Sequence, residues 1–297
     1  MSPESIKTAV DGRELTISNL DKVFYPEVGF TKGEMIDYYA RIAPVMLPHV
    51  ADRPLTMKRF PDGVDRPYFF EKHLPAHAPP WVRRVSVPSG ADGGAVDYGV
   101  VDDVPALVWA ANLAAIEFHV PLWRVGRRRS LPGPPDHMVF DLDPGEGASM
   151  VECCAVALDI SEMLEERSLE GVAKTSGSKG LQVYVPLVGR PSWDRVRTDA
   201  RRIATRLEAE RPDLVVSNMR KSLRTGKVLV DWSQNHPAKT TVAAYSLRAR
   251  PAPTASTPVT WEEVAACHEA GDPALLRFTA GDVLSRVDEL GDLFAPV

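Results

Sequence analysis

Apolar positions recur with helical spacing in two stretches of the second half of the chain. They lie three or four residues apart between 148 and 167 and again between 193 and 207, which places them on one face of a helix. The positions are Cys153, Val156, Ile160, Met163 and Leu164 in the first stretch, and Trp193, Val196, Ala200, Ile203 and Leu207 in the second. Both stretches therefore predict amphipathic helices. Two further helices are predicted nearer the N-terminus, over Lys32 to Leu47 and over Pro105 to Ala115.

Short runs with β character surround the two helices of the second half. In chain order they are MVFDLD, VAKTSG, LQVYVPL, KVLVDWS and KTTVAAYSL. The resulting order, β-α-β-β-α-β plus an extra strand, is typical of the split βαβ or ferredoxin-like arrangement, in which two helices cover one face of a sheet and the other face stays open. We therefore expect an α+β protein with a ferredoxin-like, or RRM-like, core and an N-terminal α/β module packed on it.

Length and composition are those of an ordinary globular protein. The chain has 297 residues, of which 44% are hydrophobic and 25% charged. We expect a single domain over 1–297, made of an N-terminal module (1–135), a core (136–250) and a C-terminal helical appendix (251–297) that begins with the linker-like stretch PAPTASTP. No run approaches the roughly 18 apolar residues of a membrane span, and no signal-peptide pattern opens the sequence. A cytoplasmic location without membrane contact is therefore expected.

Charge is unevenly distributed along the sequence. The net charge is −5, which taken alone argues against a nucleic-acid partner. However, residues 201–250 contain eleven Lys or Arg and four Asp or Glu, a local balance of +7, whereas residues 251–297 contain two Arg and eight acids, a balance of −6. A local basic face can bind phosphate backbones even on an acidic protein.

The run MVFDLDPGEG ends in two aspartates one residue apart. Strand side chains alternate between faces, so Asp141 and Asp143 point the same way while Leu142 points into the opposite layer. Two ionised carboxylates on neighbouring positions of one strand face repel each other. A divalent cation bound between them usually offsets that repulsion. For this pair alone, the alternative is an aspartate that caps the next helix beside a solvated partner.

A third aspartate, Asp231, ends another apolar run in KVLVDWSQN. A lone aspartate after a strand is usually a turn residue. A metal held by carboxylates, however, takes about three hard oxygen ligands from different elements, and these three aspartates would supply them. Two such ions could bridge a nucleoside triphosphate in an in-line displacement.

The stretch KTSGSKGLQVYVP places a Ser-Gly-Ser-Lys-Gly turn between two predicted strands. Its glycines would let backbone N–H groups approach an anion, which predicts a phosphate-binding loop. The alternative is a hairpin turn with an exposed Lys179. The stretch is not a P-loop, because the GxxxxGK[ST] spacing is absent and no helix follows it directly.

Seven segments in order resemble the polymerase domain of bacterial ATP-dependent DNA ligase D, a member of the archaeo-eukaryotic primase superfamily. They are DKVFYP, PYFFEK, EFHVPLW, FDLDPGEG, TSGSKGL, VDWSQN and YSLR, over roughly residues 15–250. The resemblance implies a primase-like palm and a template-directed nucleotidyltransferase that fills gaps or extends broken DNA ends in non-homologous end joining. It also implies a preference for ribonucleotides, two Mn²⁺ or Mg²⁺ ions, gapped or broken DNA with a 5′-phosphate as substrate, and Ku and an ATP-dependent ligase as partners in the bacterial nucleoid.

The same resemblance assigns roles to individual residues. Asp141, Asp143 and Asp231 would be catalytic and hold the metal ions. The residues implied in contacts with the triphosphate or ribose are Lys58, His119, Ser176, Lys179, Gly180, Gln182, Gln234 and Arg248. The residues implied in contacts with DNA are Lys22 and Lys32 at a 5′-phosphate, Phe69 and Phe70 against template bases, and Arg220, Lys221 and Arg224 in a basic loop.

Each of these assignments has a simpler alternative. His119 could be satisfied within its strand, Lys22 and Lys32 could be solvated surface charges, and the phenylalanine pair could place one ring in the core and expose the other. The run MRKSLRTGK could be a plain charged hairpin.

The sequence departs from the family pattern at Gln182, where SGSKGLH has a histidine. A histidine can become cationic beside a triphosphate, whereas glutamine offers a neutral amide. On this reasoning nucleotide affinity would fall about tenfold, and Gln182→His would restore it.

Three rival functions remain at this stage. A phosphatase of the haloacid dehalogenase type also uses an hhhDxD strand end, but it needs Thr or a similar residue where Gly145 stands. A DxD glycosyltransferase leaves TSGSKG and VDWSQN unexplained. The third rival is a DNA-end bridging module with weak or lost polymerase activity. No KxDG adenylation motif of a ligase is present, so the sequence is that of a stand-alone polymerase or of a fragment of a larger ligase.

Overall fold

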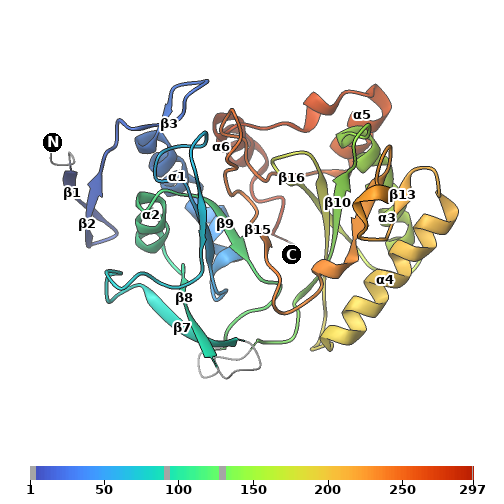
Figure 1. Ribbon diagram of the computed structural model, residues 1–297, viewed down its shortest axis with the longest axis horizontal. Helices are drawn as coiled ribbons and strands as arrows, with labels where there is room; N and C mark the ends of the chain where they lie inside the picture. Colours follow the sequence, from blue (N-terminus) through green and yellow to red (C-terminus); the bar gives the residue numbers. More distant parts are fainter. Residues whose placement is uncertain (1–4, 90–93, 127–131, 296) are drawn as a thin grey trace.

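The computed structural model describes residues 5–89, 94–126, 132–295 and 297. Figure 1 shows two halves side by side, with the N-terminal elements in blue to green on one side and β10, α3, α4, β13 and α5 on the other. The orange segment that carries β15 runs between the halves, and the C-terminus lies in the middle of the view. None of the described helices has the length and apolarity needed to cross a membrane.

The N-terminal half contains most of the short strands. Its elements are β1 (Ser5–Val10), β2 (Arg13–Ser18), β3 (Val23–Tyr25), β4 (Phe30–Thr31), α1 (Lys32–Val50), β5 (Thr56–Arg59), β6 (Phe69–Glu71), β7 (Arg83–Ser89), β8 (Gly94–Val100), α2 (Val104–Asn112) and β9 (Ala115–Val120). Strands β9, β5 and β6 form a sheet to which β15 adds at the edge, in the order β15-β9-β5-β6.

The second half contains the core sheet and four helices. Its elements are β10 (His137–Pro144), α3 (Met150–Glu165), β11 (Val172–Thr175), β12 (Leu181–Pro186), α4 (Trp193–Glu210), β13 (Val215–Val216), the 3₁₀ turn Lys221–Leu223, β14 (Val228–Asp231), the 3₁₀ turn Trp232–Gln234, β15 (Thr241–Val242), β16 (Pro258–Val259), α5 (Trp261–Ala270), the 3₁₀ turn Pro273–Leu276 and α6 (Ala280–Leu290).

The core sheet has the strand order β13-β14-β10-β12-β11-β16. Its four central strands, β14-β10-β12-β11, pair antiparallel throughout, and their order in space relative to the chain is 4-1-3-2. That order is the split βαβ arrangement, because β10-α3-β11 and β12-α4-β14 are its two βαβ units. The predicted α+β fold with a ferredoxin-like core is confirmed.

Alternation along the strands separates two hydrophobic cores. On β10, Met138, Phe140 and Leu142 pack with the apolar faces of α3 and α4, whereas Val139 packs with the residues of the N-terminal half. Asp141 follows Val139 on that second face because side chains repeat with a period of two. The helices therefore cover one face of the sheet, and the acidic residues look toward the N-terminal half.

Helix positions agree with the apolar spacing, and side-chain caps define where the helices begin. Ser149 and Glu152 form a capping box at the start of α3, and the Ser192 side chain caps α4. Helix α1 extends three residues beyond the predicted Leu47 and contains prolines at 44 and 48. Helix α2 ends at Asn112, before the predicted Ala115, which opens β9 instead.

Two expectations about the core sheet were wrong. KTTVAAYSL does not add a strand to this sheet, because only Thr241–Val242 is extended and it pairs with β9 in the other sheet. The face opposite the helices is not open either. The N-terminal half packs against part of it, since Val139 and Tyr184 are buried in the N-terminal core, and the remainder forms one wall of a cleft.

The stretch PAPTASTP is not a linker. Thr254, Ala255, Ser256 and Thr257 are all buried, and the strand that follows, β16, pairs with β11. The helices after it pack on both halves: Val264 of α5 belongs to the core of the second half, and Val283 of α6 belongs to that of the first. The C-terminal segment therefore ties the two halves together.

Candidate active site

Three aspartates lie on the face of the core sheet that is turned away from its helices. Asp141 on β10 and Asp231 on β14 are direct cross-strand partners, so their Cβ atoms lie roughly 4.5–5.5 Å apart on the same face. Asp143 lies two residues further along β10 and shares that face. The structure thus brings together three carboxylates that are up to 90 residues apart in the chain.

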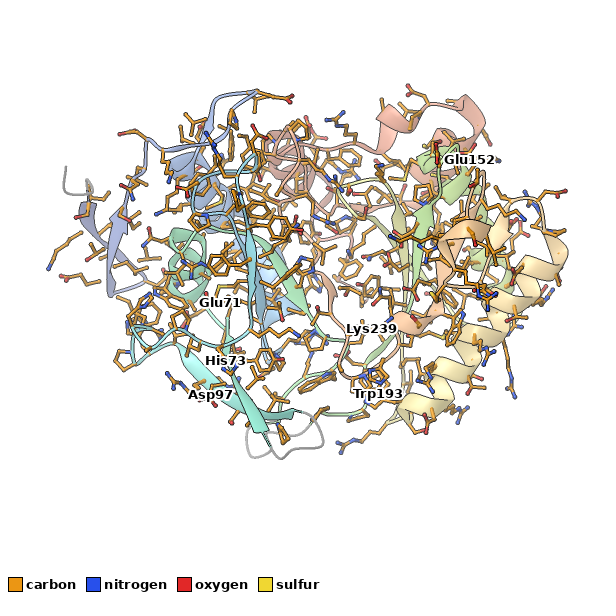
Figure 2. All side chains as sticks on the ribbon, in the orientation of Figure 1. Glu71, His73, Asp97, Glu152, Trp193 and Lys239 are labelled. Atoms are coloured by element: carbon orange, nitrogen blue, oxygen red, sulfur yellow. The ribbon has the colours of Figure 1, made fainter. Side chains whose placement is uncertain are left out.

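Within the described residues, no Lys or Arg side chain lies within hydrogen-bonding distance of these carboxylates. Burial, followed by the charge of Asp143, raises the pKa of Asp141 to about 7. Burial and then the charge of Asp231 raise the pKa of Asp143. The nearest ammonium, that of Lys239, is 4.0 Å from Asp231 Oδ2, and Figure 2 places Lys239 between the two halves. The site therefore holds an excess of negative charge.

The donor chemistry fits a hard divalent cation. Carboxylate oxygens are the ligands that Mg²⁺ and Mn²⁺ prefer, and a cation would relieve the repulsion among the three groups. Within the described ranges, no three His, Cys, Asp or Glu side chains already converge in a metal-holding arrangement. Instead, Asp231 Oδ1 accepts hydrogen bonds from Ser233 N at 2.8 Å and Ser233 Oγ at 2.5 Å. These hydrogen-bond partners of Asp231 are neutral. Rotation of the carboxylates would therefore turn their oxygens toward a cation.

A cavity of about 330 Å³ opens beside the carboxylates. Its lining includes two of the aspartates and most of the residues that sequence analysis placed at the triphosphate. The predicted residues in the lining are His119, Asp141, Asp143, Ser176, Lys179, Gly180, Gln182 and Arg248. Arg250, which sequence analysis did not single out, also lines the cavity. Elements from both halves thus contribute to one site.

The Ser-Gly-Ser-Lys-Gly loop folds around its first serine. The backbone N–H groups of Ser178 and Gly180 both donate to Ser176 Oγ, at 3.2 and 3.1 Å. Two of the loop's N–H groups, those of Ser178 and Gly180, are therefore used within the loop itself. Because Ser176 Oγ accepts from both, its own hydroxyl proton is available to a ligand, as is the exposed ammonium of Lys179.

The loop glycines are required for close packing against the protein's own backbone. A Cβ on Gly180 would lie 2.0 Å from the carbonyl oxygen of Leu142, between the two aspartates of β10. Gly177 has a φ of +66° and a Cβ there would lie 2.5 Å from Ala255. Arg248 NH1 donates to Ser176 O, and Arg250 donates to Ser178 Oγ. The loop is therefore held rigidly between β10 and the buried C-terminal segment.

Glu117 organises the cations on the opposite wall, and sequence analysis missed it. The Glu117 carboxylate is 2% exposed and lies 3.4 Å from Lys58 Nζ, 3.0 Å from His119 Nε2 and 3.3 Å from Arg248 Nε. Although burial opposes it, the hydrogen bond from His119 and these charges lower the Glu117 pKa to about 2. The signal was present in EFHVP, because positions 117 and 119 share one face of a strand.

Gln182 and Gln234 contact the carboxylates directly. Gln182 Nε2 donates to Asp141 Oδ1 at 2.8 Å, and Gln234 Nε2 lies 3.2 Å from Asp231 Oδ2 and 3.4 Å from Asp141 Oδ2. The other end of Gln182 accepts from Lys174, which is completely buried and was also missed by sequence analysis. A lysine inside an otherwise apolar strand was the available signal. Gln182 is thus directed at Asp141 and not at the mouth of the cavity.

Phe69 and Phe70 are both exposed, at 44% and 56%, so neither ring is a core residue. Strand alternation points them to opposite sides of β6. The Phe70 ring lies 6.0 Å from the His119 ring, beside the cavity, whereas the Phe69 ring is stacked with Arg59. Tyr68, 52% exposed, adds a third surface aromatic, 4.2 Å from Lys58 Nζ.

The two lysines predicted at a 5′-phosphate lie near each other but already have protein partners. Lys22 Nζ donates to Asp62 Oδ1 at 2.6 Å. Lys32 is 4% exposed, which corrects the alternative of a solvated charge, and its amine donates to Ser18 O and Asn112 Oδ1. Burial, together with the charges of Lys22 and Arg59, lowers the Lys32 pKa to about 8. The corner therefore contains several cations, with Lys22 the more accessible of the two.

The predicted basic loop lies against the turn that follows Asp143. Arg220 and Lys221 are exposed, and Gly145 N donates to Lys227 O at 2.8 Å. A Cβ on Gly145 would meet the Arg224 carbonyl at 1.8 Å, and the Arg224 charge opposes the rise in the Asp143 pKa. The loop therefore places the Arg224 charge near Asp143 and leaves Arg220 and Lys221 exposed.

This chain is similar to proteins of a known family. Residues 31–294 match the family model described as "LigD, primase-polymerase domain". The multifunctional non-homologous end joining protein LigD of Mycolicibacterium smegmatis is 46% identical over 281 residues, which is 95% of this chain and 36% of that protein. The corresponding LigD of Pseudomonas aeruginosa is 33% identical over 84% of this chain and 29% of its own length.

A solved structure gives the same result in three dimensions. The polymerase domain from Mycobacterium tuberculosis ligase D, in complex with DNA, superposes with a TM-score of 0.88 at 47% identity, covering 95% of this chain and 97% of that one. The chain spans only 36% of the length of the M. smegmatis relative. On the family match, the sequence identity and the structural agreement, this chain belongs to the LigD primase-polymerase domain family.

Proposed function

We propose that the chain is a DNA-directed nucleotidyltransferase that adds nucleotides, ribonucleotides preferentially, to a primer 3′-hydroxyl at DNA gaps and broken ends. The observation that carries the proposal is the cleft itself, in which Asp141 and Asp143 of β10 share one cavity with His119 of the other half and with the cationic residues Lys179, Arg248 and Arg250. The family match supports a polymerase reaction. Neither a phosphatase nor a glycosyltransferase explains both the acidic residues on one side of the cavity and the cationic residues on the other.

The acidic wall would hold two divalent ions, Mn²⁺ or Mg²⁺, through Asp141, Asp143 and Asp231. When bound, such ions lower the pKa of an attacking hydroxyl and neutralise a leaving pyrophosphate. Asp143 is exposed and faces the cavity beside the basic loop, which suits it to the primer side. Asp141 lies deeper, between Gln182 and Gln234, which suits it to a position shared by both substrates.

The cationic wall would bind the triphosphate. Arg248 and Lys179 supply charge, and the Ser176 hydroxyl supplies a neutral donor whose direction the loop fixes. Because Glu117 fixes His119, Lys58 and Arg248 before any ligand arrives, these groups lose little freedom on binding. Preorganised donors of this kind stabilise developing charge without rearranging.

DNA would lie across both halves. Phe70 beside the cavity would stack on a template base, and Arg220, Lys221 and Arg224 would contact the backbone near the carboxylates. The corner that contains Lys22, Lys32 and Arg59 would receive the 5′-phosphate across a gap. The local cations offset the net charge of −5 and would make affinity fall with salt.

The test is extension of a gapped duplex by the purified chain. Incorporation of ATP, GTP, dATP and dGTP opposite a matched template base is measured with Mn²⁺ or Mg²⁺, on gaps bearing either a 5′-phosphate or a 5′-hydroxyl. We expect templated addition that is greater with ribonucleotides, greater with Mn²⁺ and greater with the 5′-phosphate. The Asp141→Ala variant should lose addition while binding the duplex with unchanged affinity by fluorescence anisotropy.

Two results would contradict the proposal. Nucleotide addition that does not depend on the template base would exclude a template-directed polymerase. Tight, phosphate-dependent DNA binding without any addition by the wild type would favour the rival function, a DNA-end bridging module. Because the relatives are longer end-joining proteins, we further propose that Ku and an ATP-dependent ligase are partners, and co-elution of purified Ku with this chain on gapped DNA would test that.

A further inference from the structure

A fully buried lysine lies beneath the acidic wall. Lys174 on β11 has 0% of its surface exposed, and its Nζ donates to Gln182 Oε1 at 2.6 Å, Ser256 Oγ at 2.7 Å and Val242 O at 3.0 Å. An ammonium group has three N–H donors and no acceptor. All three donors of Lys174 are therefore used inside the protein, on partners from three separate segments.

This lysine determines which way the Gln182 amide points. Because Lys174 can only donate, the atom of Gln182 that faces it must be the carbonyl oxygen. The NH₂ group then points the other way, and it donates to Asp141 Oδ1 at 2.8 Å. Gln182 is itself only 4% exposed. The three side chains form a continuous row, Lys174 to Gln182 to Asp141, across β11, β12 and β10, whose residues Lys174, Gln182 and Asp141 are register partners.

We propose that Lys174 and Gln182 are positioning residues that orient the Asp141 carboxylate for metal binding. This inference rests on the proposed function and deepens it. A lysine in direct contact with Asp141 would neutralise the carboxylate and compete with a metal ion. With an uncharged amide between them, the carboxylate is held in one orientation and its second oxygen is left for the cation.

The row also changes the interpretation of the residue at 182. Sequence analysis treated Gln182 as a weaker triphosphate contact in place of a histidine. The Gln182 oxygen accepts from Lys174 and its NH₂ group donates to Asp141, however, so both polar ends already have protein partners and only the second N–H of the amide is left for a phosphate. A neutral imidazole can make the same two contacts, because one ring nitrogen accepts while the other donates. Glutamine and histidine would then be equivalent in this position.

The proposal is tested by breaking the row and by restoring it. Gln182→Met removes both polar ends at similar length, and Gln182→His restores them. Tyr184→Phe is the matched control, because it deletes a buried hydrogen bond to Thr241 from the same face of β12 without contacting the row through a polar atom. Three quantities are measured: Mn²⁺ affinity of the protein without DNA or nucleotide, by titration calorimetry; kcat and KM for ATP on a gapped duplex; and the melting temperature.

We expect Gln182→Met to weaken Mn²⁺ binding about tenfold and to lower kcat by a similar factor, with the KM for ATP within twofold of the wild type. Gln182→His should return Mn²⁺ affinity to within about threefold of the wild type. Tyr184→Phe should lower the melting temperature and leave Mn²⁺ affinity unchanged. If Gln182→Met does not fold, Gln182→Asn replaces it, because the shorter amide cannot span from Lys174 to Asp141.

A rise in the KM for ATP with unchanged Mn²⁺ affinity would overturn the proposal and make Gln182 a direct nucleotide contact. Equal loss of Mn²⁺ affinity in Tyr184→Phe would overturn it too, since the effect would then be one of general stability. If the wild type binds Mn²⁺ but adds no nucleotide, the proposed function fails, and the comparison of Mn²⁺ affinities still decides whether the row positions Asp141.

Discussion

The two walls of the cleft treat charge in opposite ways. On the acidic wall, Asp141 and Asp143 have raised pKa values because burial and their neighbours' charges disfavour ionisation, and the amides of Gln182 and Gln234 are the close partners of Asp141. On the cationic wall, Glu117 is surrounded by Lys58, His119 and Arg248, and its pKa is lowered to about 2. The acidic wall has negative charge that no cation of the described residues neutralises and that a ligand can therefore use. On the cationic wall, the ion pairs with Glu117 fix the positions of the side chains. The difference predicts which variants lose activity and which lose stability.

The largest effect should follow neutralisation of the acidic wall. Asp143→Asn removes, from an exposed position, a charge that the proposed function assigns to metal binding, so we expect nucleotide addition to fall about a thousandfold, equivalent to about 4 kcal/mol of activation free energy. The free energy of unfolding should stay within about 0.5 kcal/mol of the wild type. Single-turnover addition and urea denaturation measure the two quantities.

The matched control for this variant is Asp288→Asn, which removes the same charge from an exposed position of α6. It should change neither quantity. If Asp143→Asn destabilises the protein as strongly as it impairs addition, the acidic wall has a structural role and the contrast between the walls is lost.

On the cationic wall, we expect the main loss to be in the stability of the protein. Glu117→Gln leaves the partly buried charges of Lys58 and Arg248 without a counter-charge, and removing the buried partner of such pairs should lower the free energy of unfolding by about 3 kcal/mol. Glu14→Gln, which breaks an exposed pair with Lys7, should cost less than about 0.5 kcal/mol. Equal losses in the two variants, measured by urea denaturation, would show that Glu117 does not organise the wall.

Acid should weaken the cationic wall through the same residue. The Glu117 pKa is about 2 in the folded protein, against an ordinary value of 4.5 for a glutamate, so the unfolded state takes up the proton first as pH falls. Its contribution is therefore complete above about pH 5 and is lost as pH falls toward 2, with about 2 kcal/mol lost between pH 7 and pH 3. The measurement is the wild-type minus Glu117→Gln difference in unfolding free energy across that range, and a flat difference would contradict the assignment.

The smallest effect concerns the aromatic rim beside the cationic wall. Phe70 lies next to His119, whereas Phe69 packs with Arg59 on the other side of β6. We expect Phe70→Ala to weaken binding of a gapped duplex by about 1–2 kcal/mol through lost stacking. Phe69 is also exposed. Phe69→Ala should have less effect than Phe70→Ala on both duplex binding and nucleotide addition. Fluorescence anisotropy and primer extension compare the two, and a larger loss in Phe69→Ala would reverse the assignment.

Local sequence determined much of this protein. The period of two in MVFDLD was sufficient to place Asp141 and Asp143 on one face, and the apolar spacing at 148–167 and 193–207 was sufficient to place α3 and α4 against the other. These features depend on residues a few positions apart, whose geometry the backbone sets directly. The order of the elements then indicated the ferredoxin-like core, and seven ordered motifs indicated the family.

Only the tertiary structure decided how distant segments meet. Asp231 opposes Asp141 because β14 pairs with β10 in one register, and a shift of one residue would turn its side chain to the other face. Glu117 and Lys174 were overlooked because a single polar residue in a strand carries no local mark of its partners, which come from β5, β12 and the segment after β15. PAPTASTP has the composition of a loop, yet it is buried because both halves pack around it. Pairing and burial of this kind depend on contacts across the whole chain, which no local pattern records.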